Sequence, residues 1–106
     1  MISVTMYKAS GSYRGFRSEG HADYAEEGYD IICAAVSALT VNAVNSIEAF
    51  TEDAYTVGQD DGYLELTLEG SVSEKTQLLL DSMVLGLQGI TDTYGKQYIE
   101  LSFREV

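Results

Sequence analysis

The 106-residue sequence contains no proline and no tryptophan, one histidine and one cysteine, and only six lysine and arginine residues. A single cysteine cannot form a disulfide within the chain, which fits a reducing cytoplasm. One histidine and one cysteine are too few for a closed zinc site, so we expect no metal and no other cofactor. Because proline is missing and the glycines are scattered, no segment has linker composition, and we expect a single domain over residues 1–106.

Basic residues are outnumbered by 17 aspartate and glutamate residues, which gives a formal net charge of −11. Nucleic acid binding depends on lysine and arginine side chains that neutralise phosphates, so we expect no direct binding to DNA or RNA. Anionic membranes are disfavoured for the same reason, and we expect no segment with the roughly 20 apolar residues of a membrane span. The N-terminus lacks the features of a signal peptide. A cationic partner, by contrast, would be attracted.

Hydrophobic periodicity predicts seven elements in the order ββαββαβ. Apolar residues alternate with polar ones from Ile2, which is typical of a strand. Further strands are expected at 13–20, 54–59, 63–69 and 97–104, and helices at 31–50 and from Ser73 to about Tyr94. Hairpins imply mostly antiparallel pairing. The expected fold is therefore α+β, a single mostly antiparallel sheet with two helices packed against it.

Three local features add detail to this fold. The sequence Asp60-Asp61-Gly62 is a strong signal for a hairpin turn. The second helix is apolar on more than one face, which indicates two neighbours: the sheet, and either the first helix or a second subunit. The last strand offers four candidate core residues, Tyr98, Ile99, Leu101 and Phe103.

The stretch GHADYAEEGYDIICAAVS, residues 20–37, contains the chain's only histidine, His21, and its only cysteine, Cys33. Residues 22–29 have no clear period and are interpreted as a loop. Asp30 is typical of a helix N-cap, because its side chain can accept from backbone N–H groups of the first turn. Cys33 would then be the third helical residue, with its own N–H among the first-turn donors.

A helix end alone is too weak to activate Cys33. Its charge effect is worth roughly 0.3–1 kcal/mol, which moves a thiol pKa by less than about one unit. A cysteine with a pKa near about 8.5 is only a few per cent thiolate at neutral pH. A nearby imidazole would supply the difference, and His21 is the only candidate. The hypothesis is that Cys33 is a nucleophile, His21 its general base and acid, and the first-turn N–H groups an oxyanion site.

Each of these residues also has a structural interpretation. Cys33 can be a buried small hydrophobic residue, and His21 a structural or exposed one. Asp30 can serve only as a cap, or it can also orient the imidazole. Ser37, one turn after Cys33, can donate to the Cys33 carbonyl or help to fix the cysteine. For the whole protein, two alternatives to an enzyme stay open: a non-catalytic acidic binding module that docks a cationic partner, and a redox sensor with an external thiol partner.

The motif resembles the signature of a known family, the ribosomal-processing cysteine proteases Prp. GHA at residues 20–22, a loop, and GYDIICAAVS at residues 28–37 agree with that signature without a departure. The resemblance implies a small homodimeric cytoplasmic peptidase of bacteria. It further implies removal of a short N-terminal extension from the large-subunit ribosomal protein twenty-seven precursor, whose basic character would suit the acidic chain.

The resemblance also assigns roles to residues in the motif. It implies that Cys33 and His21 are catalytic. It implies that Gly20, before the histidine, lets the loop move, and that Asp30 and Ser37 have supporting roles.

Overall fold

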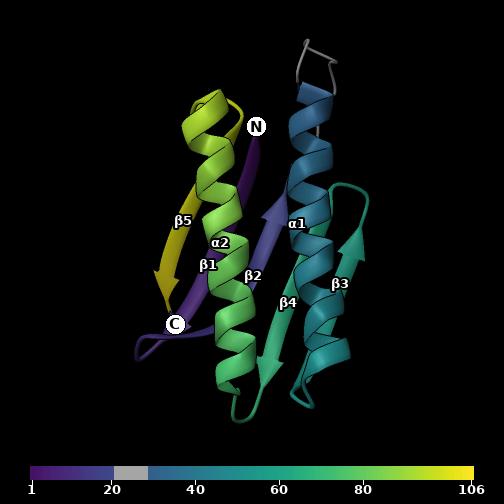
Figure 1. Cartoon of the computed structure of the whole chain (residues 1–106), viewed down its shortest axis with the longest axis vertical. Coiled ribbons are helices and arrows are strands. Elements are labelled where there is room, and N and C mark those ends of the chain that lie inside the picture. Colours follow the sequence, from purple (N-terminus) through teal and green to yellow (C-terminus); the bar gives the residue numbers. More distant parts are fainter. Residues whose placement is uncertain (21–28) are drawn as a thin grey trace.

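The protein forms a five-stranded sheet with two helices on one face, as a computed structural model of residues 1–20 and 29–106 shows (Figure 1). The elements are β1 (Ile2–Ala9), β2 (Ser12–Glu19), α1 (Tyr29–Phe50), β3 (Ala54–Asp60), β4 (Tyr63–Glu69), α2 (Glu74–Tyr94) and β5 (Ile99–Glu105). The α+β class and the order ββαββαβ are thereby confirmed. Element ends agree with the expected ones to within two residues.

The strand order in the sheet is β3-β4-β2-β1-β5. The β1–β2, β2–β4 and β3–β4 pairs are antiparallel, and the β1–β5 pair is parallel. A helix, α2, precedes β5, and a crossover of this kind allows a parallel pair that a short hairpin does not. Strands β3 and β5 are the two edges. The expected hairpin turn is confirmed at Asp61-Gly62, where Gly62 has a φ of 68° that favours glycine.

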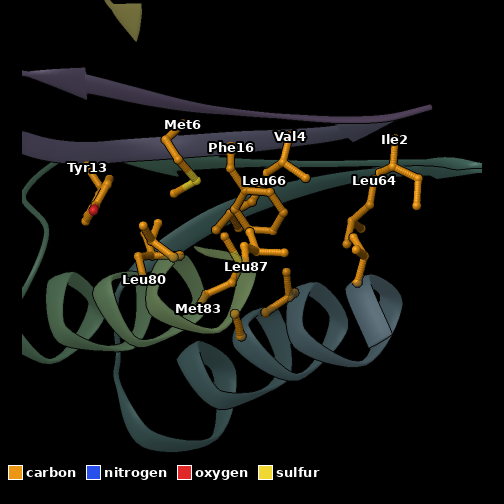
Figure 2. Close-up of a cluster of buried hydrophobic side chains, with 14 of the residues drawn as sticks. Ile2, Val4, Met6, Tyr13, Phe16, Leu64, Leu66, Leu80, Met83 and Leu87 are labelled. Carbon is orange, nitrogen blue, oxygen red and sulfur yellow. The ribbon is translucent and has the colours of Figure 1, made fainter. Parts of the chain in front are cut away.

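The core lies between the sheet and the two helices (Figure 2). Its buried side chains come from alternate positions of β1 and β4, from β2, and from the inner faces of the helices. They include Ile2, Val4, Met6, Phe16, Ile32, Val36, Ile47, Leu64, Leu66, Leu80, Met83 and Leu87. Of the core residues expected in the last strand, Ile99 is buried, Tyr98 and Leu101 are half-buried, and Phe103 is 50% exposed. The expectation for Phe103 is wrong because β5 is an edge strand with only one neighbour.

Helix α2 has the two neighbours that its apolar faces indicate. One is the sheet and the other is α1, against which it lies along much of its length (Figure 1). At one contact between the helices Gly86 faces Leu39, and a Cβ added at Gly86 would lie 2.9 Å from the Leu39 Cδ1 atom. Leu78 and Leu85 on the outer side of α2 remain exposed.

One expectation about α1 is wrong. The segment Ile31–Phe50 is 20 residues long with a mean hydropathy of 1.5, which is long and apolar enough to cross a membrane by length and composition. Within the fold, part of this apolar character serves the core: Ile32, Val36, Val44 and Ile47 are buried between helix and sheet.

A polar cluster joins the end of α1 to the start of α2. Ser73 is the N-cap of α2, and its hydroxyl accepts from the Thr76 backbone N–H, as expected for a cap. The Asp53 Oδ2 atom accepts from the Ser73 N–H at 2.9 Å, from the Ser73 hydroxyl at 2.8 Å and from the Thr76 hydroxyl. The carboxylate therefore holds the α1–β3 connection against the first turn of α2.

This cluster predicts a loss of stability in acid. The pKa of Asp53 is lowered, first by the Thr76 hydroxyl and further by the two Ser73 donors, against an opposing effect of burial. A carboxylate whose pKa is lower in the folded state stabilises the fold above its unfolded pKa of about 3.9. That contribution is lost as the pH falls through the folded pKa. In thermal unfolding from pH 2 to 6, the melting temperature of Asp53→Asn should fall less below pH 4 than that of wild type. Glu52→Gln is the matched control, and its melting temperature should depend on pH as that of wild type does. The same pH dependence in Asp53→Asn and wild type would show that Asp53 makes no such contribution.

Candidate active site

A cleft of about 310 Å³ lies at one end of the molecule, beside the N-terminal half of α1. The end of β2 and the tip of the β3–β4 hairpin lie at this same end (Figure 1). The lining residues come from four segments: Ile2; Ser18 and Gly20; Cys33, Val36, Ser37, Thr40 and Val41 of α1; and Gln59, Asp60, Asp61, Gly62, Tyr63 and Leu64 of the hairpin. The cleft thus brings together Gly20, Cys33 and Ser37, three of the residues singled out in the motif.

Cys33 lies between the core and the cleft. It is half-buried and packs against the buried cluster, while it also lines the cleft. Its neighbours Ile32 and Val36 are almost fully buried, so the face of α1 that carries the cysteine is held by core packing. The interpretation of Cys33 as a buried hydrophobic residue is therefore incomplete, because the residue also reaches the cleft surface.

The start of α1 differs from the expectation. The helix begins at Tyr29, so Asp30 lies inside its first turn and is not the N-cap, and Cys33 is the fifth helical residue and not the third. In an α-helix the N–H groups of the first turn have no acceptor within the helix, and Cys33, as the fifth residue, lies beyond them. The Cys33 N–H faces the Tyr29 carbonyl instead. Any helix donor to an oxyanion must come from the turn before the cysteine.

Gly20 is held at the rim of the cleft by its backbone. Its φ of 117° is a conformation that side-chain-bearing residues rarely adopt, and a Cβ added there would lie 2.3 Å from the Met1 carbonyl oxygen. Its N–H donates to the Gly62 carbonyl at 3.0 Å, so the hairpin turn and the end of β2 are tied together. Both observations explain a glycine at this position without reference to motion.

The cleft contains Ser37, which the motif analysis singled out, and further residues that it missed. Ser37 is exposed, as its place one turn after Cys33 allows, and its predicted bond to the Cys33 carbonyl stays a prediction. Thr40, a further turn along, is 2% exposed and donates to the Val36 carbonyl at 2.9 Å. The spacing 33-37-40 predicts that these three residues share one face of the helix, so Thr40 could have been found from the sequence. The hairpin residues carried no such signal, because their approach to α1 depends on the sheet order.

The cleft is acidic. Asp60 and Asp61 line it, and none of the described lining residues is a lysine or an arginine. The Asp60 carboxylate accepts from the Asp61 N–H at 2.8 Å, which fixes the turn that carries both side chains. A cationic group that enters the cleft meets only negative or neutral side chains among the residues described.

His21 lies outside the described residues, as do the side chains of residues 22–30, so the predicted proximity of His21 to Cys33 stays a prediction. In the described part of the chain, no three His, Cys, Asp or Glu side chains gather as metal ligands. A second hollow of about 390 Å³ lies between α2 and β5 and is lined by residues such as Gln88, Lys96 and Phe103. It contains no nucleophilic cysteine, so the thiol chemistry belongs to the first cleft.

The only cysteine of this α+β domain lines a cleft beside the N-terminal half of a core helix, and the protein is a cysteine protease. Residues 1–100 match the family model described as cysteine protease Prp. The chain belongs to the Prp family, as the motif resemblance implies.

Individual relatives agree with this assignment over most of their length. The ribosomal processing cysteine protease Prp of Bacillus subtilis is 34% identical over 101 residues, which cover 89% of this chain and 90% of the relative. Two crystal structures of the Staphylococcus aureus protease Prp are similar in fold. One has a covalently linked product peptide, with 31% identity and a TM-score of 0.87; the other has a substrate peptide, with 30% identity and a TM-score of 0.89. Each match covers 98% of this chain and 100% of the relative.

Proposed function

We propose that this protease removes the N-terminal extension of the large-subunit ribosomal protein twenty-seven precursor during ribosome maturation, with Cys33 as nucleophile and His21 as general base and acid. The observation that carries the proposal is that Cys33 lines the same cleft as Gly20, the residue directly before His21. Relatives at about a third identity are named ribosomal processing proteases, and one is known with a covalently linked product peptide.

The proposed reaction proceeds through a thioester. His21 takes the proton of Cys33, and the thiolate sulfur attacks the scissile carbonyl carbon. N–H groups of the first turn of α1 stabilise the negative oxygen. The carbon–nitrogen bond then breaks, and His21 donates its proton to the departing amine. A water molecule, deprotonated by His21, attacks the thioester, releases the acid and restores the thiol.

Supporting roles are proposed for three further residues. Gly20 sets the path of the chain into His21, because its positive φ and its bond to Gly62 determine the direction in which the backbone leaves β2. Asp30 orients the imidazole from the first turn of α1. Ser37 lines the cleft one turn below Cys33 and helps to fix the cysteine or the bound peptide.

We further propose that the substrate extension is basic, that the protein acts in the cytoplasm, and that it is a homodimer. The acidic cleft and the net charge of −11 favour a basic peptide and a fast encounter with it. The lone cysteine suits a reducing compartment. Leu78 and Leu85 are exposed two turns apart on α2, which supports an apolar contact between two copies of the chain. Sedimentation at micromolar concentration measures the oligomeric state.

Two measurements test the catalytic assignment. Alkylation of Cys33 by iodoacetamide should proceed well below pH 8 in wild type and should lose that low-pH reactivity in His21→Ala, because the imidazole supplies the activation. Cleavage of a precursor peptide should fall by about 10⁴-fold or more in Cys33→Ala. Val41→Ala, a change in the same cleft without catalytic chemistry, is the matched control.

The outcomes separate the candidate functions. Cleavage by Cys33→Ala at the wild-type rate would refute the mechanism. A thiol with low-pH reactivity in a protein that leaves the precursor intact would favour the redox alternative. A thiol that reacts at no pH, together with tight binding of the precursor, would favour the acidic binding module.

A further inference from the structure

Strand β3 offers an open edge beside the cleft. It is an outer strand of the sheet, and no other strand of the described chain pairs with its far side. Its residues Ala54–Asp60 are nearly all exposed, and they include neither proline nor lysine, the residues with which proteins commonly protect an edge. An edge of this kind is suited to pairing with an extended chain.

The hydrogen bonds around β4 show which groups of β3 point outward. The Leu68 carbonyl accepts a hydrogen bond from the Arg14 guanidinium, and the Gly62 carbonyl accepts one from the Gly20 N–H. Both donors belong to β2 or its end, so the even-numbered backbone groups of β4 face β2. Groups alternate along a strand, so the odd-numbered residues of β4 bond to β3. Their partners on β3 are the even-numbered residues, as in the pair Asp60 and Tyr63 that closes the two-residue turn.

The backbone groups of Tyr55, Val57 and Gln59 therefore face away from the sheet. They form a row of donors and acceptors that extends over about 13 Å at the usual strand rise. The row ends at the cleft, since Gln59 and Asp60 line the same cleft as Cys33. An extended chain paired with this row would reach the cleft that Cys33 lines.

The surroundings of this edge are negative. No lysine or arginine occurs between Arg17 and Lys75, a span that contains β3, its neighbour β4 and α1. Glu48 lies beside Tyr55: burial first, and then the charge of Glu48, raise the pKa of the tyrosine. Glu65 pairs across from Gly58. An extended peptide with basic side chains would meet no repulsion from the described residues along this row.

We propose that β3 is the docking strand for the substrate: the basic precursor peptide pairs with the outer edge of β3 as a sixth strand and so enters the cleft at Cys33. This inference rests on the proposed function and adds where the peptide lies. Backbone bonds to Tyr55, Val57 and Gln59 supply affinity, while the acidic side chains favour basic residues. The edge is thus a binding element and takes no part in bond cleavage.

The first test changes the substrate and leaves the protein intact. A synthetic precursor peptide that spans the cleavage site is N-methylated at one residue at a time, which removes one N–H and blocks close strand pairing. Strand addition predicts that KM rises about fivefold or more at every second residue on one side of the scissile bond, with little change at the residues between. The side on which the pattern falls gives the direction of the peptide along β3. Effects without this alternation would overturn the proposal.

The second test changes the strand. Val57→Pro removes an outward N–H without removing a bond to β4, a placement that edge strands accept. Its KM should rise about tenfold with kcat within twofold of wild type. Val57→Ala, which loses the side chain but keeps the N–H, is the matched control and should change KM by less than threefold. Melting temperatures show whether each variant is folded, and the N-methyl series decides the question if Val57→Pro is not.

The results distinguish this inference from the function on which it rests. If wild type leaves the unmodified peptide intact, the proposed function has failed. If wild type cleaves it but Val57→Pro has an unchanged KM, only the docking strand is wrong. If Val57→Pro converts a dimer to monomers, the edge pairs with a second copy of the chain and the proposal is overturned.

Discussion

Gly15→Ala should lower the melting temperature by about 12 °C or more, the largest loss of stability that we expect from one methyl group in this chain. An added Cβ would lie 2.1 Å from the Leu66 carbonyl oxygen and 3.1 Å from the Leu66 carbonyl carbon. The obstacle is the backbone of β4, which no side-chain rotation can move. Separating β2 from β4 there should cost about 3 kcal/mol or more, where a whole domain is stabilised by about 5–15 kcal/mol.

Gly11→Ala is the matched control for this prediction. Gly11 has a positive φ of 82°, but a Cβ added there meets nothing within 4 Å. Only the conformational penalty of about 1–2 kcal/mol should remain. Thermal or urea unfolding of both variants measures the difference. Equal losses for Gly11→Ala and Gly15→Ala would show that close approach of the strands is not the cause.

Gly20→Ala should reduce kcat/KM for the precursor peptide by about 100-fold or more while the protein remains folded. The methyl group would lie 2.3 Å from the Met1 carbonyl oxygen, on a backbone with a φ of 117°. To remove this clash, either the backbone of residue 20 must rotate or the N-terminal residue Met1 must shift. Rotation breaks the 3.0 Å bond to the Gly62 carbonyl and redirects the chain at the residue before His21. A base displaced by about 1 Å can cost a factor of about 100.

Gly70→Ala provides the comparison for activity. Gly70 has a φ of 67°, open space around its Cα, and a position after β4 at the end of the strand away from the cleft. Its activity should stay within about threefold of wild type, even though both substitutions place alanine at a positive φ. Steady-state kinetics with melting temperatures for both variants check this. Near-wild-type kcat/KM for Gly20→Ala would mean that this backbone does not position the proposed base.

Much of the fold follows from rules that act along short stretches of chain. Alternation from Ile2 specifies a strand, Asp61-Gly62 a tight turn, and Ser73 the start of a helix, and the structure contains all three. Helical spacing also places Cys33 and Ser37 on one face. The start of α1 was harder to predict, because the glycine-bounded segment before it has no period; the helix includes Asp30 where a cap was expected.

Other features depend on residues that are far apart in the chain. Phe103 is as apolar as the core residues, yet it is half exposed because β5 lies at an edge of the sheet. The carboxylate of Asp53 is bound by donors 20 and 23 residues away. The periodicity of the sequence does not predict such contacts, because they form only when the helices pack on the sheet.

The sequence by itself determined the order of elements, the acidic character, and the motif that carries His21 and Cys33. The tertiary structure alone decided that the β3–β4 hairpin lines the same cleft as Cys33, that Gly62 holds Gly20 at its rim, and that the open edge of β3 ends there. The physical reason is the range of the forces involved. Backbone geometry and local hydrogen bonds act between neighbours, whereas sheet order and clefts result from burial of apolar surface by the whole chain.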